Sequence, residues 1–204
     1  MKKERPPIDK NAEWQKFLSH ADGITFRELF NCFFKPLYGY GIKLCNQPEL
    51  VKDCIQELFR NLWERRDDLA HIESPNVYLF VSLRRKILKE RANHRKKRNN
   101  LNEIDGNGFI QFAKEDLIIR DEVKYQKREE LKDALNQLPD RQKEVIFLHF
   151  YNGMSYGEIE EILSINRQSV RNHVYRAMET LRTLLDTEIM KLVVSLLITF
   201  LFFG

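Results

Sequence analysis

The chain has 204 residues, of which 43% are hydrophobic and 31% charged, and its formal net charge is +4. Eight glycines and six prolines are few for this length, and the long stretches rich in Leu, Glu, Lys and Arg favour helices in one or two folded domains. Cys32, Cys45 and Cys54 form no CxxC pair and accompany no paired His cluster, which argues against a zinc site or a disulfide framework, and no apolar run follows the charged N-terminus as a secretory signal requires.

The first half of the chain predicts three helices after a polar beginning. Residues 1–23 contain Pro6-Pro7 and are expected to form a loose arm, with a short helix around Trp14 to Leu18. From Phe26 to about Leu44, apolar and aromatic side chains recur at steps of three and four residues, the helical period. The next helix is expected over roughly Pro48–Arg65, with Asn46 as a cap and Pro48 in the first turn.

The helix over 48–65 has two different faces. Its apolar stripe consists of Val51, Ile55, Leu58 and Leu62. The helical period places polar residues on the opposite side. These residues are Asp53, Gln56, Arg60 and Glu64.

A third helix begins at Ser74-Pro75, continues through Leu79, Phe80, Leu83 and Ile87, and runs into a basic block. Nine of the fifteen residues from Arg84 to Arg98 are Lys or Arg, and one is acidic, so this segment carries +8 and the remainder of the chain −4. A local basic block on a nearly balanced protein indicates a polyanion bound at one place, although an isolated charge run is usually just a solvated face.

The helical pattern fails after Arg98. Residues 99–116 are predicted to form a linker with Gly106 and Gly108 as flexible points. Helical character resumes near Leu117 and stops at Leu138-Pro139, and three further helices fit between Asp140 and about Asp186. No strand pattern or internal repeat is apparent, so we predict an all-α fold of two helical domains joined by a linker.

The last two of these helices are typical of a helix-turn-helix. Ser155 and Glu158 match a capping box, and Ser164-Ile165-Asn166 is a three-residue turn. The second helix is expected to bury Val170, Val174, Ala177, Leu181 and Leu184. Its other side would offer Gln and Asn for adenine edges and Arg for guanine or phosphate, from Gln168, Ser169, Arg171, Asn172, Tyr175 and Arg176. An ordinary helical hairpin with a solvated polar face is the alternative.

The stretch from Ala134 to Leu185 resembles the fourth conserved region of the extracytoplasmic-function sigma factors. The resemblance rests on Leu138-Pro139, the Ser155-Tyr156-x-Glu158-Ile159 run and Arg176-Ala177. It implies binding to an upstream promoter element.

The segment from Phe26 to Leu69 resembles the second sigma region. Asp53, Gln56, Glu57, Phe59 and Trp63 match the D-x-x-Q-E-x-F-x-x-x-W run of that family. The resemblance implies that this helix docks on core RNA polymerase, and we assign the contact to Asp53, Gln56, Glu57 and Arg60. Phe59 and Trp63 are taken as shared between the core and the interface.

The helix from Tyr78 to Arg98 resembles the part of the second region that binds and opens the downstream promoter element. The residues that this implies are Tyr78, Arg84, Arg85, Lys89, Arg91 and Arg95. Family members usually have asparagine where this chain has Arg85. Arginine keeps the affinity for phosphate but need not read the same base, which leaves the downstream sequence preference open.

The C-terminal segment Leu192–Phe203 has no charged residue. As a helix it would be ~18 Å long, too short for a hydrocarbon core of ~30 Å. Two interpretations remain: a tail that docks in an apolar groove of this protein or a partner, or a segment at the inner membrane surface.

These observations divide the chain into a polar N-terminal arm (1–23), sigma region 2 (24–98), a linker (99–120), sigma region 4 (121–186) and an apolar tail (187–204). The expected function is promoter-specific transcription initiation with core RNA polymerase, promoter DNA and an anti-sigma factor, often membrane-bound, as partners. The expected location is the cytoplasm, with the inner membrane surface as an alternative for the tail. A stand-alone helix-turn-helix regulator is the alternative function. An enzyme such as a serine recombinase would need Ser82 as its nucleophile, and no catalytic residue, cofactor, metal or small-molecule substrate is expected.

Overall fold

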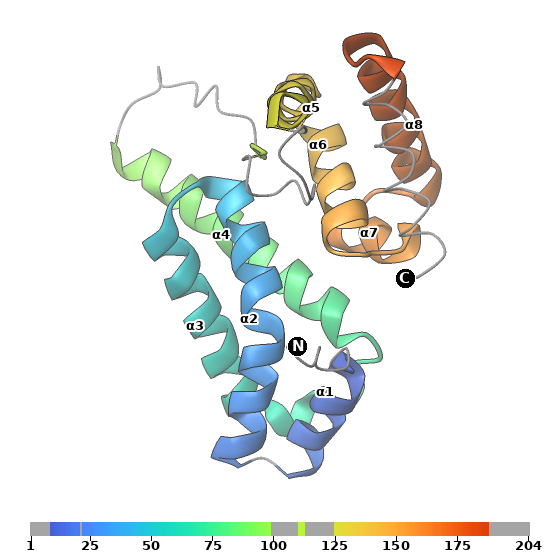
Figure 1. Ribbon diagram of the computed structural model, residues 1–204. Helices are drawn as coiled ribbons and strands as arrows, with labels where there is room; N and C mark the ends of the chain where they lie inside the picture. The colour runs from blue at the N-terminus through green and yellow to red at the C-terminus, as the bar shows by residue number, and fades with distance from the viewer. Residues whose placement is uncertain (1–8, 21, 99–109, 113–124, 188–204) are drawn as a thin grey trace. The chain divides into compact units, whose positions relative to one another are not determined.

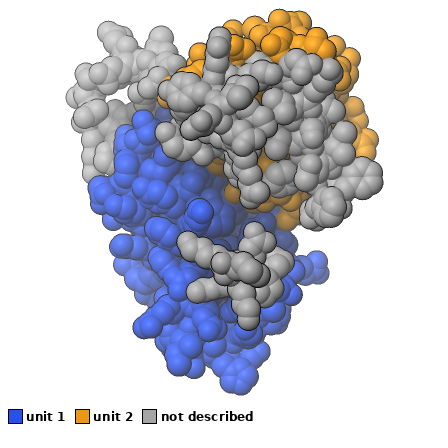
Figure 2. Space-filling view, in the orientation of Figure 1, with its two compact units in different colours: residues 1–100 blue, residues 101–204 orange. Residues whose placement is uncertain are grey.

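The computed structural model describes residues 9–20, 22–98, 110–112 and 125–187, and every regular element within them is a helix (Figure 1). The chain divides into two compact units, residues 1–100 and 101–204 (Figure 2). The predicted all-α fold with two helical domains is thereby confirmed. None of the described helices combines the length and the apolar character that crossing a membrane requires.

Unit 1 consists of four helices packed around a shared core. They are α1 (Lys10–Ser19), α2 (Gly23–Cys45), α3 (Pro48–Glu64) and α4 (Pro75–Arg98), with a short 3-10 turn, η1 (Arg66–Asp68), between α3 and α4. The long helix α2 packs against the other three, and α3 and α4 also pack against each other. Leu37, Tyr40, Ile55, Phe80 and Ile87 are among the fully buried side chains that they share.

The prediction of a loose N-terminal arm is wrong for residues 10–19, although the short helix itself is confirmed. Helix α1 begins at Asp9, whose side chain accepts hydrogen bonds from the N–H groups of Asn11 and Ala12. Trp14 and Phe17 lie on one face of α1 and are completely buried. Burying two large aromatic side chains stabilises the helix's contact with α2 and α4 despite its polar composition.

The sequence predicts that Asn46 caps the beginning of α3, whereas in the structure Asn46 caps the C-terminus of α2. Asn46 adopts the left-handed conformation (φ 46°) at the C-terminus of α2, and its N–H donates to the carbonyl of Ile42. Asparagine tolerates this conformation better than most residues. Gln47 is the N-cap of α3 without a side-chain hydrogen bond, and Pro48 occupies the first turn as predicted.

Unit 2 contains α5 (Tyr125–Gln137), α6 (Asp140–Ile146), α7 (Tyr156–Leu163) and α8 (Arg167–Leu184). A π-helical turn, η4 (Phe147–Tyr151), extends α6. The main packing is between α6 and α8 and between α7 and α8. The three helices expected between 140 and 186 are therefore present, and part of the expected linker, residues 110–112, also belongs to this unit.

The three thiols are all free, and the most enclosed is Cys54 on α3. Burial raises the pKa of the Cys54 thiol to about 11. Burial also raises the pKa of the Cys45 and Cys32 thiols. These cysteines therefore act as small apolar side chains at neutral pH.

Helix α2 lies close to α3 and α4 at Gly41, which is buried. A Cβ atom at Gly41 would lie 2.5 Å from Val51 Cγ1 and 3.2 Å from Ile87 Cδ1. A Cβ atom at Gly39, in the same helix, would have no atom within 4 Å. Packing therefore requires glycine at position 41 but not at position 39.

We expect Gly41→Ala to destabilise unit 1 by about 1–3 kcal/mol, because the stiff Val51 side chain cannot move aside without a shift of α3. Gly39→Ala is the matched control and should stabilise the protein by about 0.5–1 kcal/mol, since alanine favours helix more than glycine does. Denaturant unfolding of both variants measures the difference. Equal effects of the two substitutions would contradict the close contact.

Candidate nucleic-acid interface

The turn between α7 and α8 is fixed by hydrogen bonds at both helix ends. The Ser155 hydroxyl accepts from the N–H of Glu158, and the Glu158 carboxylate accepts from the Ser155 N–H at 2.8 Å, which confirms the predicted capping box. Ser164 ends α7 in the left-handed conformation (φ 54°). Asn166 begins α8 by accepting from the N–H of Ser169 at 2.8 Å. The geometry is that of a helix-turn-helix.

One face of α8 anchors it to unit 2. Val170, Ala177 and Leu181 are buried, as the periodicity predicts, and Val174 is half-buried. The prediction is wrong for Leu184, which is 42% exposed, while the next residue, Leu185, is buried. Helix α8 ends at this point and Leu185 adopts an extended conformation, so the helical period no longer decides which side chain points inward.

The opposite face of α8 is polar and exposed. Gln168, Arg171, Asn172, Tyr175 and Arg176 are all exposed, and Ser169 is half-buried. The Gln168 amide donates to the Asn172 side chain at 3.0 Å, so two of these side chains orient each other. The structure thus brings the six predicted reading residues to the first three turns of one helix.

Two titratable groups on α8 keep definite protonation states. A hydrogen bond with the Glu179 side chain raises the pKa of the Tyr175 phenol. Burial, helped by the charges of Arg141 and Arg176, lowers the pKa of His173. The phenol therefore stays protonated and the imidazole stays neutral at neutral pH, and the positive charge of the face comes from its arginines.

The predicted downstream-element residues on α4 differ in their surroundings. Arg85 and Lys89 are exposed, whereas Tyr78, Arg84 and Arg91 are half-buried. The Arg91 guanidinium donates to the carbonyl of Leu44 at 2.7 Å, near the C-terminus of α2. A cation at a helix C-terminus is favourable, so Arg91 has a structural contact that the sequence did not indicate. The side chain of Arg95 lies outside the described residues.

The predicted polymerase-binding ridge lies along α3. Asp53, Gln56 and Arg60 are exposed, and Arg60 forms an ion pair of 3.8 Å with Glu64 on the same face. Glu57 beside them is half-exposed and pairs with Lys86 of α4 at 2.5 Å. The hydrogen bond from Lys86 lowers the pKa of the Glu57 carboxyl, which stays ionised.

The two aromatic residues of the sequence motif take different positions. Phe59 is 2% exposed and belongs to the core, in contact with Phe26 and Phe30 of α2 at 6.0 and 4.9 Å between ring centroids. Trp63 is half-buried, and its ring centroid lies 5.2 Å from that of Phe26. Trp63 alone of the pair is therefore accessible beside the ridge.

Aromatic residues of α2 form a further feature that the sequence analysis did not single out as a surface. The rings of Phe30 and Phe34 are stacked at 5.1 Å, and those of Phe34 and Tyr38 at 5.6 Å. All three are half-buried. The four-residue spacing of these aromatics along a helix was the signal that could have identified the row. Within the described parts of the chain, no group of three or more His, Cys, Asp or Glu side chains is placed to hold a metal ion.

Comparisons with known proteins find similarity to sigma factors of RNA polymerase. Residues 128–181 match the family model described as "Sigma-70, region 4". The chain is 22% identical over 161 residues to the ECF RNA polymerase sigma factor SigM of Bacillus subtilis (strain 168), covering 79% of this chain and 95% of the relative. It is 26% identical over 168 residues to the ECF RNA polymerase sigma factor SigL of Mycobacterium tuberculosis (strain ATCC 25618 / H37Rv), covering 81% and 92%.

Two solved structures share the fold. One is the sigma factor RpoE in complex with the anti-sigma factor NepR from Bartonella quintana, with a TM-score of 0.55, 21% identity and coverage of 78% of this chain and 95% of that one. The other is CnrH in complex with the cytosolic domain of CnrY, with a TM-score of 0.55, 19% identity and coverage of 86% and 97%. The similarity includes both helical units, since it spans nearly the full length of each structure.

Proposed function

We propose that the chain is an extracytoplasmic-function sigma factor, which binds core RNA polymerase and directs transcription initiation at specific promoters. The observation that carries the proposal is the combination, in one chain, of a helix-turn-helix with a polar exposed face and a second helical unit with a polar ridge on α3. A stand-alone regulator needs only the first of these features. Ser82 is half-buried within α4, and no catalytic role is proposed for it.

We assign the upstream promoter element to α8, within residues 121–186. Gln168 and Asn172 suit adenine edges, and Arg171 and Arg176 suit guanine or phosphate. The N-terminal residues of a reading helix contact base edges in the major groove, and these four lie in the first three turns of α8. Ser169 and Tyr175 complete the proposed contact surface.

We assign the downstream element and its opening to α4, within residues 24–98. A protein that holds single-stranded DNA needs positive charge along the DNA backbone. Arg85 and Lys89 are exposed on α4 and can supply it. Tyr78 and Arg84 lie half-buried on the same helix. Arg95 is assigned to this DNA-binding surface from the sequence alone. Arg91 is anchored to the end of α2, and it would contribute to the field of the block rather than reach for DNA.

Attachment to polymerase is assigned to the α3 ridge of Asp53, Gln56, Glu57 and Arg60. A surface of charged and amide side chains beside an accessible tryptophan has the mixed character of a protein interface. Because Glu57 is already paired with Lys86, the exposed members Asp53 and Gln56 are the residues to test.

Regulation by a partner follows from the relatives. One solved relative is in complex with an anti-sigma factor, and the other is in complex with the cytosolic domain of its partner. We propose that this chain, too, is held by an anti-sigma protein, which can be membrane-bound. Its place of action would be the cytoplasm.

The apolar segment 192–203 lies outside the described residues, and its role is proposed from the sequence. We favour a tail that docks in an apolar groove and holds the factor inactive. The alternative is contact with the inner membrane surface, which fits the low charge of the segment.

The decisive experiment is transcription in a purified system. The wild-type chain should copurify with core polymerase and start transcripts at defined promoters, and sequencing those transcripts would identify the promoters.

Asp53→Ala combined with Gln56→Ala should weaken attachment to core polymerase at least tenfold, about 1.4 kcal/mol. Glu49→Ala, which deletes a carboxylate in the first turn of the same helix, is the matched control. Unchanged attachment in a folded double variant would rule out the ridge as the polymerase-binding surface. If the chain bound promoter DNA but not polymerase, it would be a stand-alone regulator.

Substitutions on α8 should change which promoters are chosen. Arg171→Ala should cost about 1–3 kcal/mol in promoter binding and relax the preference at one base pair, because a bidentate contact is lost. Arg182→Ala removes the same charge from the last turn of α8 and should leave the sequence preference unchanged. Binding to a library of upstream elements measures both. The same preference profile for the Arg171 variant and the wild type would exclude this residue from base reading.

Deleting residues 188–204 tests the tail. If the tail docks and inhibits, promoter activity rises and the distribution between membrane and soluble fractions does not change. If the tail contacts the membrane, the protein moves to the soluble fraction. No change in either measurement would show that the tail is inert.

A further inference from the structure

Three residues of the expected linker are held firmly by unit 2. Ile110 is completely buried and Phe112 is 3% exposed, while Gln111 between them is exposed. Burial that alternates from one residue to the next is the pattern of an extended chain with one face against a surface. Both apolar side chains of the segment Ile110–Phe112 are therefore buried, and the contacts of Phe112 are with residues of unit 2.

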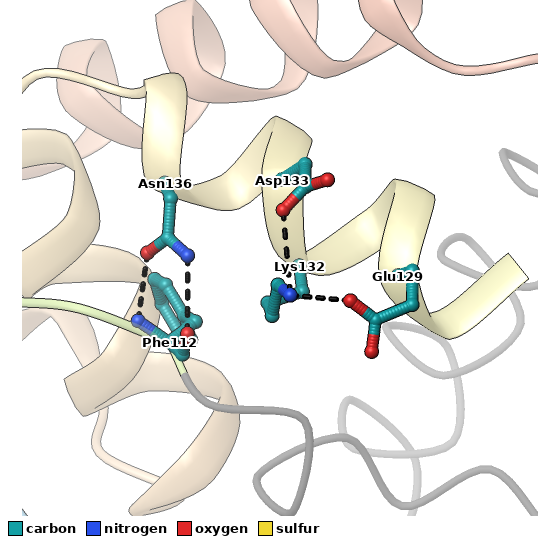
Figure 3. Close-up of polar contacts among 5 residues, drawn as sticks. All are labelled: Phe112, Glu129, Lys132, Asp133 and Asn136. Carbon is teal, nitrogen blue, oxygen red and sulfur yellow. Dashed lines mark hydrogen bonds and ion pairs between the residues drawn. The ribbon is translucent and has the colours of Figure 1, made fainter. Parts of the chain in front are cut away.

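The backbone of Phe112 is bound by the side chain of Asn136, on the last turn of α5 (Figure 3). The Phe112 N–H donates to Asn136 Oδ1 at 2.8 Å, and Asn136 Nδ2 donates to the Phe112 carbonyl at 3.0 Å. One amide thus satisfies both hydrogen-bonding groups of a single residue, as a neighbouring strand does in a sheet. Main-chain bonds of this kind, with pockets for alternate side chains, are how proteins bind extended peptides.

The aromatic side of the contact comes from the π-helical turn η4. The Phe112 ring lies 5.5 Å from that of Tyr151 and 6.2 Å from that of Phe147, between centroids. Phe147 and Tyr151 are themselves stacked, 5.2 Å apart with an angle of 12° between their planes. The wide turn, closed by the Asn152 N–H on the carbonyl of Phe147, presents both rings on one side.

Asn136 is held in place by its own helix and by the next one. Its neighbours Leu135 and Leu138 are buried, which fixes the rotation of α5 at this point. The backbone carbonyl of Asn136 accepts from Lys143 Nζ of α6 at 3.3 Å. These contacts fix the backbone from which the Asn136 side chain projects.

We propose that Asn136, Phe147 and Tyr151 form a peptide-binding site on unit 2, specific for an extended segment with an apolar residue, any residue and an aromatic residue. Its ligand in this chain is the chain's own Ile110–Phe112. In sequence, this segment lies between Arg98, the last residue of α4, and Tyr125, the first residue of α5.

The site is tested in the full chain by hydrogen exchange at the Phe112 amide. A bound segment detaches locally while the rest of unit 2 stays folded. The Phe112 amide should therefore exchange at least tenfold faster than the amide of Leu181 in α8. Asn136→Asp keeps an acceptor for the Phe112 N–H but removes the donor to its carbonyl, and should speed exchange at Phe112 at least tenfold while leaving Leu181 unchanged. Glu130→Gln, an exposed change on the same helix, is the control and should change neither amide.

Competition shows whether the segment behaves as a ligand. A synthetic peptide with the sequence of residues 108–113, Gly-Phe-Ile-Gln-Phe-Ala, should speed exchange of the Phe112 amide when added at millimolar concentration, the effective concentration typical of a short tether. The same peptide with serine at its third and fifth positions should have no effect. A fluorescent form of the peptide should bind the Ile110→Ser/Phe112→Ser double variant at least tenfold more tightly than the wild-type chain.

The proposal is overturned if the Phe112 amide exchanges only together with Leu181 and does not respond to the peptide, because the segment would then be an ordinary part of the core. It is also overturned if a folded double variant fails to bind the peptide. None of these measurements involves polymerase or DNA, so their outcome is independent of the proposed function.

Discussion

Helices α3 and α8 depend on the same constraint, which is the burial of one face of a helix whose opposite face must remain polar. On α3 the buried side chains are Val51, Cys54, Ile55, Leu58, Phe59 and Leu62, and on α8 they are Val170, Ala177 and Leu181. Fully burying a large aliphatic side chain contributes roughly 1.5–3 kcal/mol, so the buried face of each helix stabilises its packing in the unit. The faces left exposed are then available for partners without any cost to the core.

The basic residues of α4 are not equivalent, although the sequence presents them as one block. Lys86 neutralises Glu57 across the α3–α4 contact, and Arg91 binds the backbone at the end of α2. Arg85 and Lys89 are exposed on the same helix. The block therefore combines charges that assemble unit 1 with charges that can meet a polyanion, and its formal charge overstates what an external partner encounters.

Local patterns were enough to predict the helices, the capping box of α7 and the polar faces of α3 and α8, because each depends on residues within one or two turns of one another. The pattern could not show that Trp14 and Phe17 dock α1 on the rest of unit 1, or that Arg91 reaches the carbonyl of Leu44, since these contacts join residues far apart in the sequence. The same holds for Phe112 and Asn136, which are 24 positions apart. The errors at Asn46 and Leu184 arose at helix ends, where backbone conformation rather than periodicity decides the role of a residue.

The left-handed Ser164 begins a closely bonded turn between α7 and α8. Hydrogen bonds close the chain on both sides of the three-residue turn, at Ser164 itself and at Asn166. Under the proposed function, a change of DNA target would come from exchanging side chains on the outer face of α8, while the turn and the buried face of the hairpin stay as they are. A new promoter preference could then evolve, or be engineered, without rebuilding the fold beneath it.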